Sequence, residues 1–144
     1  MTAQPLEFTQ ELTRDLQAHL ALCQETLDLA ARENQALASP AGYQSFEFYQ
    51  QRKDLLPRLD QSLMLLRNWR QRWQEVSPAE RARCPEVKAL FQSVQDLLMK
   101  VLLLDRENQQ ALLRQGLLPA RHLPAAAVQQ PHCVADLYRR HSRR

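Results

Sequence analysis

Apolar residues recur at intervals of three and four along the first part of the chain. The stripe consists of Leu12, Leu16, Leu20, Cys23, Leu27, Ala30, Asn34 and Leu37. This spacing predicts a long helix with one apolar face. Pro40 and Gly42 follow it, and they predict the turn at which the helix ends.

A second apolar stripe predicts a helix from about Tyr43 to Val76. Its members are Phe46, Tyr49, Leu56, Leu59, Leu63, Leu66, Trp69 or Arg70, and Trp73. Pro57 lies inside this segment. Proline lacks an N–H donor and crowds the preceding turn, so we expect a kink or a local opening there.

A helix start is predicted at Ser77, where serine precedes Pro78 and Glu80 in the order of a capping box. Cys84 and Pro85 interrupt this turn, and the main third helix follows over residues 85–115, a rod of roughly 45 Å. Its apolar positions are Val87, Leu90, Phe91, Val94, Leu97, Leu98, Val101, Leu104, Asn108 and Leu112. Residues 97–104 are apolar around much of the helix, and a surplus apolar face would need a partner.

The last part of the chain is predicted to be a flexible tail with a short helix. Pro119 and Pro124 indicate an extended linker. Val134, Leu137 and Tyr138 then recur at helical spacing, but so short a helix is unstable alone in water and either folds on something or stays disordered. We therefore expect a helical bundle domain at 1–118 and a tail at 119–144.

Composition supports an all-α fold. The chain has 144 residues, two of them glycine, and aromatic residues make up 6%, which suits one helical domain better than a sheet. We predict an elongated three-helix antiparallel bundle, a coiled-coil-like hairpin with a tail.

The net charge is +3, and five arginines fall after residue 120. This basic tail either steers toward an acidic surface or is a solvated terminus.

The sequence indicates a cytoplasmic protein without a transmembrane segment. Its three cysteines suggest no disulfide framework. No signal peptide is recognisable at the start, and the most apolar run, residues 101–104, is far shorter than the ~20 residues that span a bilayer.

Candidate chemistry is sparse, so we expect no enzyme, no cofactor and no metal site. His132, Cys133 and His141 do not have ligand spacing, and we expect His19 at the surface or boundary of a helix. The stretch Arg67–Trp73 interleaves basic and aromatic residues, as in nucleic-acid binding. Trp69 and Trp73 share one helix face, however, which favours packing in the bundle, and we expect no nucleic-acid partner.

A phrase with the order Arg-Glu-Asn-Gln occurs twice, at residues 32–35 and 106–109. Asn34 and Asn108 continue stripes that are otherwise apolar. If the first and third helices run parallel, both lie near one end of the bundle. A polar residue at such a position sets helix register at some cost in stability, so we hypothesise that the two asparagines align the helices. Compositional coincidence is the alternative.

The segment from Leu104 to Leu113 is similar to the late region of the FlgN family of flagellar type III export chaperones, in which a leucine precedes Asn-x-x-Asn and a hydrophobic pair. Lys53 to Leu59 resembles the second-helix signature of that family. The resemblance covers most of residues 10–118 and a tyrosine-containing tail. Asp105 replaces the first asparagine of the family pattern, and Pro57 departs from it.

This resemblance implies a cytoplasmic chaperone that binds hook–filament junction proteins of the FlgK and FlgL type and keeps them competent for export at the inner membrane. It implies client binding by Leu97, Leu98, Val101, Leu104, Asn108, Leu112, Leu117 and Leu118. It also implies contact between the export gate and the tail at Val134, Leu137 and Tyr138. A generic helical adaptor or scaffold is the alternative function.

Overall fold

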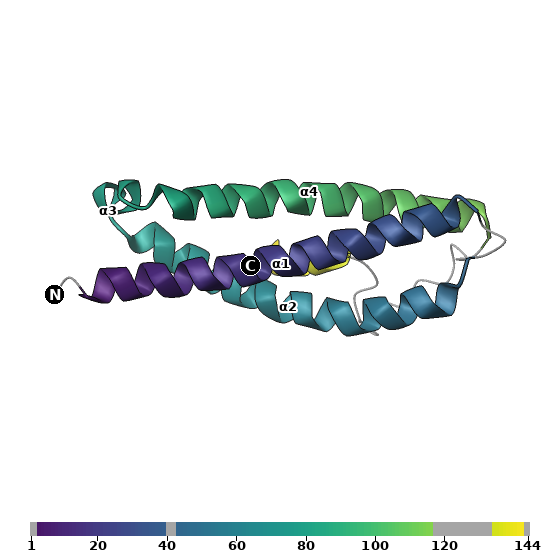
Figure 1. Ribbon diagram of the computed structural model, residues 1–144, viewed down its shortest axis with the longest axis horizontal. Helices are drawn as coiled ribbons and strands as arrows, with labels where there is room; N and C mark the ends of the chain where they lie inside the picture. The colour runs from purple at the N-terminus through teal and green to yellow at the C-terminus, as the bar shows by residue number, and fades with distance from the viewer. Residues whose placement is uncertain (1–2, 40–42, 117–133, 143–144) are drawn as a thin grey trace.

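The computed structural model describes residues 3–39, 43–116 and 134–142. These residues form five helices: α1 (Ala3–Leu37), α2 (Ser45–Glu75), α3 (Pro78–Ala82), α4 (Pro85–Arg114) and α5 (Val134–Ser142). No strand occurs within the described ranges. The fold is an elongated all-α bundle in which α1 lies between α4 and α2 (Figure 1). The predicted count of three helices was too low, because α3 and α5 are separate helices.

Helices α1 and α4 run parallel and in register. Near their beginnings, the side chains of Thr9 and Cys84 lie 3.8 Å apart across 75 residues of sequence. Near their ends, Gln115 donates to the carbonyl oxygen of Leu37 at 3.1 Å across 78 residues. The nearly constant sequence separation means that the two helices pack side by side along their whole length.

Helix α2 runs antiparallel to α1. The sequence separation of paired residues grows along α2, from 33 for Arg58 and Glu25 to 54 for Trp69 and Asp15. Pro57 does not interrupt α2, which is continuous through it, so the predicted local opening is wrong. Pro57 is exposed. Leu55 and Leu56 beside it are buried, so packing of the adjacent residues holds this turn in the bundle.

The core follows a seven-residue repeat along α1 and α4. On α4, Val87, Val94 and Val101 are at most 1% exposed and Asn108 continues the series. On α1, the two buried series are Leu12, His19, Thr26 and Glu33, and Leu16, Cys23, Ala30 and Leu37. A sustained seven-residue spacing is the coiled-coil pattern. Several core positions therefore carry polar side chains.

The ends of the helices agree with the predicted stop and start signals. The Ser77 hydroxyl accepts a hydrogen bond from the Glu80 backbone N–H at 3.2 Å, and Pro78 occupies the first turn of α3. Pro85 begins α4. Gly116 follows α4 with a φ of 70°, a left-handed conformation that glycine adopts without steric cost.

Helix α5 packs against α2 and α4 (Figure 1, yellow, behind α1). Residues 117–133, which include the predicted Pro/Ala linker, and residues 143–144 lie outside the described ranges. Within the described part of the tail, residues 134–142 form a helix that packs on the bundle. For these residues the structure therefore shows the first alternative, folding on another part of the protein. No described helix combines the length and the apolar character that a membrane crossing needs.

Candidate functional site

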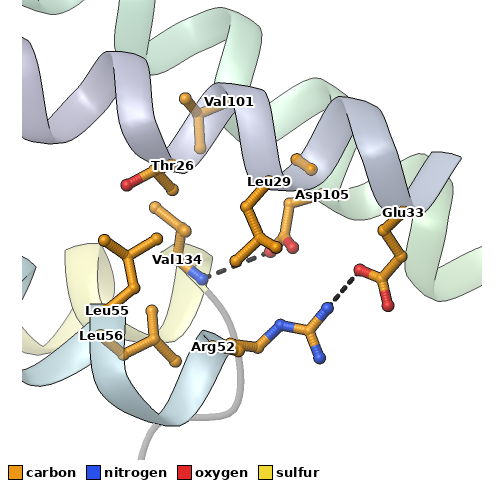
Figure 2. A pocket seen from close by; sticks show the side chains of 10 residues that line it. Thr26, Leu29, Glu33, Arg52, Leu55, Leu56, Val101, Asp105 and Val134 are labelled. Atoms are coloured by element: carbon orange, nitrogen blue, oxygen red, sulfur yellow. Dashed lines mark hydrogen bonds and ion pairs between the residues drawn. The ribbon is translucent and has the colours of Figure 1, made fainter. Parts of the chain in front are cut away.

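The candidate site is the surface of the bundle that receives α5. We call it the α5 seat and define it by Leu55, Leu56 and Asp60 of α2 and Val101 and Asp105 of α4. Val134 and Leu137 of α5 are 4% and 1% exposed against the bundle. Figure 2 shows Val134 facing side chains from α1, α2 and α4. A helix of nine residues is unstable alone, so the seat is what stabilises α5.

Each end of α5 meets an aspartate of the seat. The backbone N–H of Val134, at the start of α5, donates to Asp105 Oδ2 at 3.3 Å (Figure 2). At the other end, His141 Nε2 and Asp60 Oδ1 are 2.5 Å apart, and Arg140 lies 3.7 Å from the same carboxylate. A carboxylate near the N-terminus of a helix is stabilised by the helix dipole, and basic residues are stabilised in the last turn. Asp105 lies beside the first residue of α5, and Asp60 pairs with the basic residues of its last turn. The contacts define one direction of docking, parallel to α2.

The packing between α5 and its seat is incomplete. A cavity of about 20 Å³ remains where α5 begins. It is lined by Thr26, Leu29, Ala30, Glu33, Arg52, Leu55, Leu56, Val101, Asp105 and Val134 (Figure 2). That volume is about enough for one water molecule.

Tyr138 is the tyrosine that the family resemblance assigns to the export gate. In the bundle it is half-buried and packs against the core cluster that includes Leu137. Burial raises the pKa of its phenol above the ordinary value, and the Cys23 thiol contributes in the same direction. In this docked state, much of the Tyr138 ring is therefore covered by the bundle.

The predicted client-binding residues occupy two different environments. Leu97, Leu98 and Leu104 are half-buried on α4. The other described members, Val101, Asn108 and Leu112, are 1%, 1% and 8% exposed and belong to the interior. Leu117 and Leu118 lie outside the described residues.

Sequence reasoning missed Met99 and Leu103, which are 57% and 64% exposed on α4. The signal was present, because neither residue belongs to the seven-residue series that is buried against α1.

Asn34 and Asn108 are neighbours, as the repeated phrase predicted. Asn34 Nδ2 donates to Asn108 Oδ1 at 3.0 Å, and Asn108 Nδ2 donates to the carbonyl oxygen of Ala30 at 2.8 Å. The hypothesis that they set helix alignment is consistent with these contacts, because shifting α4 along α1 would separate both pairs. An unpaired amide at such a buried position costs about 1–3 kcal/mol.

A second buried polar group joins α1 to α2 at Glu33. This carboxylate is 1% exposed, forms an ion pair with Arg52, and accepts a 2.6 Å hydrogen bond from the Tyr43 hydroxyl. Burial and the hydrogen bond to Glu33 raise the pKa of the Tyr43 phenol. A buried carboxylate needs such partners. The buried Glu33 carboxylate is therefore stabilised by two partners, Arg52 of α2 and Tyr43, which lies just before α2 in the chain.

His19 is buried, at 1% exposure, so the expectation of a surface or boundary position was wrong. Its seven-residue spacing from Leu12 was the signal that places it inside. His19 Nδ1 is 2.7 Å from Ser62 Oγ, and Nε2 is 3.5 Å from Cys23 Sγ. Burial, aided by Arg70, lowers the pKa of His19 to about 4, and burial raises the pKa of Cys23 to about 11. The thiol thus stays protonated at neutral pH, and this cluster is structural rather than nucleophilic.

In the aromatic and basic stretch considered for nucleic-acid binding, Trp69 is buried and Trp73 is half-buried, whereas Arg67, Arg70 and Arg72 are exposed. Trp69 is 5% exposed, donates to Asp15 Oδ2 at 2.7 Å, and meets the Phe8 ring edge-to-face at 5.2 Å. Arg72 lies 4.5 Å from the Trp69 ring and 4.8 Å from the Phe8 ring. A base cannot stack on a tryptophan face that the protein already covers, so Trp69 is not a stacking platform.

Across the described ranges, no cluster of three or more His, Cys, Asp or Glu side chains has the geometry to hold a metal ion. Comparison with known proteins gives no match to a family model, a curated protein or a solved structure.

Proposed function

We propose that this protein is a cytoplasmic chaperone of flagellar type III export that binds an amphipathic helix of a secreted hook–filament junction subunit. The observation that carries the proposal is the surplus apolar surface on α4. Met99 and Leu103 are exposed there beside the half-buried Leu98, Leu102 and Leu104. An exposed apolar helix face of this kind is suited to burying the apolar stripe of a partner helix.

The family resemblance supplies the identity of the client, and the bundle supplies a compatible mode of binding. The chain already holds one amphipathic helix, α5, against α2 and α4. A client that buried its apolar face in a similar way would be prevented from assembling through that face. The export-gate role of Val134, Leu137 and Tyr138 belongs to the same proposal.

A pull-down from lysate of the native organism tests this function. The bait is the full chain, and the retained proteins are identified by mass spectrometry. We expect stoichiometric retention of a flagellar junction subunit, and this retention should persist in high salt because apolar burial is not screened. Retention of an unrelated cytosolic protein would favour the adaptor function. Nucleic acid that dissociates steeply with salt would indicate a nucleic-acid-binding bundle.

A further inference from the structure

The face of α4 that points away from α1 carries a seven-residue repeat of its own. Its members, which we call the outer stripe, alternate in spacing between three and four residues and are all exposed: Ala89, Gln92, Asp96, Met99, Leu103, Arg106, Gln110 and Leu113. On a helix this stripe lies opposite the buried series of Val87, Val94 and Val101. Figure 1 shows α4 along one edge of the bundle, with α1 on its inner side.

The chemistry of the outer stripe is symmetric about Val101. Met99 and Leu103, both apolar, lie two residues on either side of this centre. Asp96 and Arg106, of opposite charge, lie five residues on either side. The outermost two pairs, at nine and twelve residues from the centre, are Gln92 with Gln110 and Ala89 with Leu113. An apolar residue thus mirrors an apolar residue, an amide mirrors an amide, and an acid mirrors a base.

We infer that the outer stripe is a self-association surface, on which two copies of this chain pack their α4 helices antiparallel about a twofold axis at the level of Val101. With that axis, each residue faces the residue at the same distance on the other side of the centre. Met99 of one copy packs on Leu103 of the other. Asp96 of one copy pairs with Arg106 of the other. A twofold axis uses the same patch on both copies, and an apolar centre with a polar rim is the usual anatomy of a protein interface.

The charges of the outer stripe select this arrangement over others. In a parallel pair of helices, Asp96 would face Asp96 and Arg106 would face Arg106, and like charges at close range repel. If the axis of an antiparallel pair moved by half a heptad, Asp96 would face Met99 or Leu113, depending on the direction. A carboxylate covered by an apolar side chain loses hydration without gaining a cation. The axis at Val101 pairs both charges and overlaps the stripe over its full length.

The residues that flank the outer stripe fit the same arrangement. Leu102 is half-buried on one flank, next to the axis, so the two copies of Leu102 add apolar contact at the centre. Lys100 and Glu107 are exposed on the other flank. The two Lys100 side chains approach each other near the axis, and Glu107 of the opposite copy gives each flexible lysine a carboxylate to turn toward.

Self-association would cover Met99 and Leu103, which carry the proposed function. A client helix and a second copy of the chain would then compete for one face of α4, and the dimer would keep this apolar face out of water until a client binds. This competition rests on the proposed function. The self-association itself does not, because it follows from the chain's own residues.

Sedimentation equilibrium of the purified full chain over a wide range of concentration tests the inference. The wild-type chain should show a reversible monomer–dimer equilibrium. Asp96→Arg and Arg106→Asp should each weaken dimerisation roughly tenfold, because each converts both symmetry-related ion pairs into like-charge pairs. The double variant, Asp96→Arg with Arg106→Asp, should recover wild-type dimerisation, since exchanging the two charges restores both pairs.

Asp28 of α1 supplies the matched control. It is exposed and accepts a hydrogen bond from Gln24, four residues earlier, at 3.0 Å, just as Asp96 accepts one from Gln92 at 3.0 Å. Asp28→Arg should dimerise like the wild type. The combination of Asp28→Arg with Arg106→Asp has the net charge of the wild type but lacks the ion pair, and it should stay as weak as Arg106→Asp alone.

A wild-type chain that stays monomeric throughout the concentration range would overturn the inference. A dimer that none of the substitutions in the outer stripe weakens would overturn it too, because another surface would then hold the two copies. Failure of the double variant to recover would contradict the antiparallel arrangement. The substituted positions are exposed, and circular dichroism verifies that each variant stays helical. No client takes part, so failure here is distinguishable from failure of the pull-down.

Discussion

Asn34 of α1 and Asn108 of α4 are joined by a 3.0 Å hydrogen bond between their side-chain amides, across a separation of 74 residues. Asn108 continues the seven-residue series of Val87, Val94 and Val101, which are buried on α4. Asn108 is also tied to the Ala30 carbonyl. A polar pair in an apolar seam contributes little net stability, but it strongly disfavours other registers because each would leave an amide unpaired.

Asn108→Ala is therefore expected to lower the free energy of unfolding by about 2 kcal/mol, because the Asn34 amide loses its acceptor. Asn34→Leu combined with Asn108→Leu should recover much of that loss while weakening the preference for one register. Urea unfolding measures the first effect, and the dispersion of amide resonances reports the second. Gln110→Ala, at an exposed position of α4, is the control. Equal stability of Asn108→Ala and Gln110→Ala would count against the role of the pair.

The buried ion pair and an exposed ion pair should respond differently to loss of one partner. Arg52→Met leaves the Glu33 carboxylate, 1% exposed, without its cation, and should cost about 3 kcal/mol of unfolding free energy. Arg58→Met removes a pair whose side chains are 54% and 52% exposed, and should leave stability unchanged within error. Thermal and urea unfolding compare the two variants. A double variant, Glu33→Gln with Arg52→Met, should be more stable than Arg52→Met alone.

His19 should make stability depend on pH between about 4 and 6.5. Its pKa is lowered to about 4 in the folded protein, from 6.5, so the unfolded chain binds more protons in this interval. Stability from this group is complete above pH 6.5 and falls as the pH falls toward 4, by at most about 3 kcal/mol. Urea unfolding at a series of pH values should show this slope in the wild type and a reduced slope in His19→Gln. Ser62→Ala, which removes a hydrogen-bond partner and leaves the imidazole, should lower stability and keep the slope.

Leu104→Asp should abolish binding of the client while the bundle stays folded, since Leu104 is half-buried on the apolar surface of α4. The matched control is Leu65→Asp on α2, where the leucine is 45% exposed. Circular dichroism verifies folding, and titration with the purified junction subunit measures affinity. Normal affinity of Leu104→Asp would remove this face of α4 from the proposed client surface.

Under the proposed function, Tyr138→Ala should spare client binding but reduce export of the client, because the substitution removes a residue of the proposed contact with the export gate. Tyr138→Phe, which keeps the ring that packs on the bundle, separates the role of the hydroxyl from that of packing. Export is measured as the amount of junction subunit secreted by cells that carry each variant. Unchanged export by Tyr138→Ala would remove Tyr138 from the proposed gate contact.

Much of the local structure followed from the sequence alone. The capping residues Ser77 and Pro78, the terminator Gly116 and the apolar stripes locate the helices, because these signals act within one or two turns. The neighbouring positions of Asn34 and Asn108 were also predictable. Each asparagine continues the apolar stripe of its helix, and when the two helices run parallel both asparagines lie near the same end of the bundle. The coarse fold, an elongated helical bundle, required nothing more.

The tertiary structure decided which faces of a helix pack against other helices and which stay exposed to solvent. Glu33 and Glu107 occupy the same place in the repeated phrase, yet Glu33 is buried and Glu107 is exposed. Glu33 faces Arg52 of α2. Likewise, Val134 and Leu137 are an apolar pair in the sequence, and they are buried because α5 packs on α2 and α4, which are remote in the chain. Helical spacing defines a face, but burial of that face is a property of all the segments that pack together.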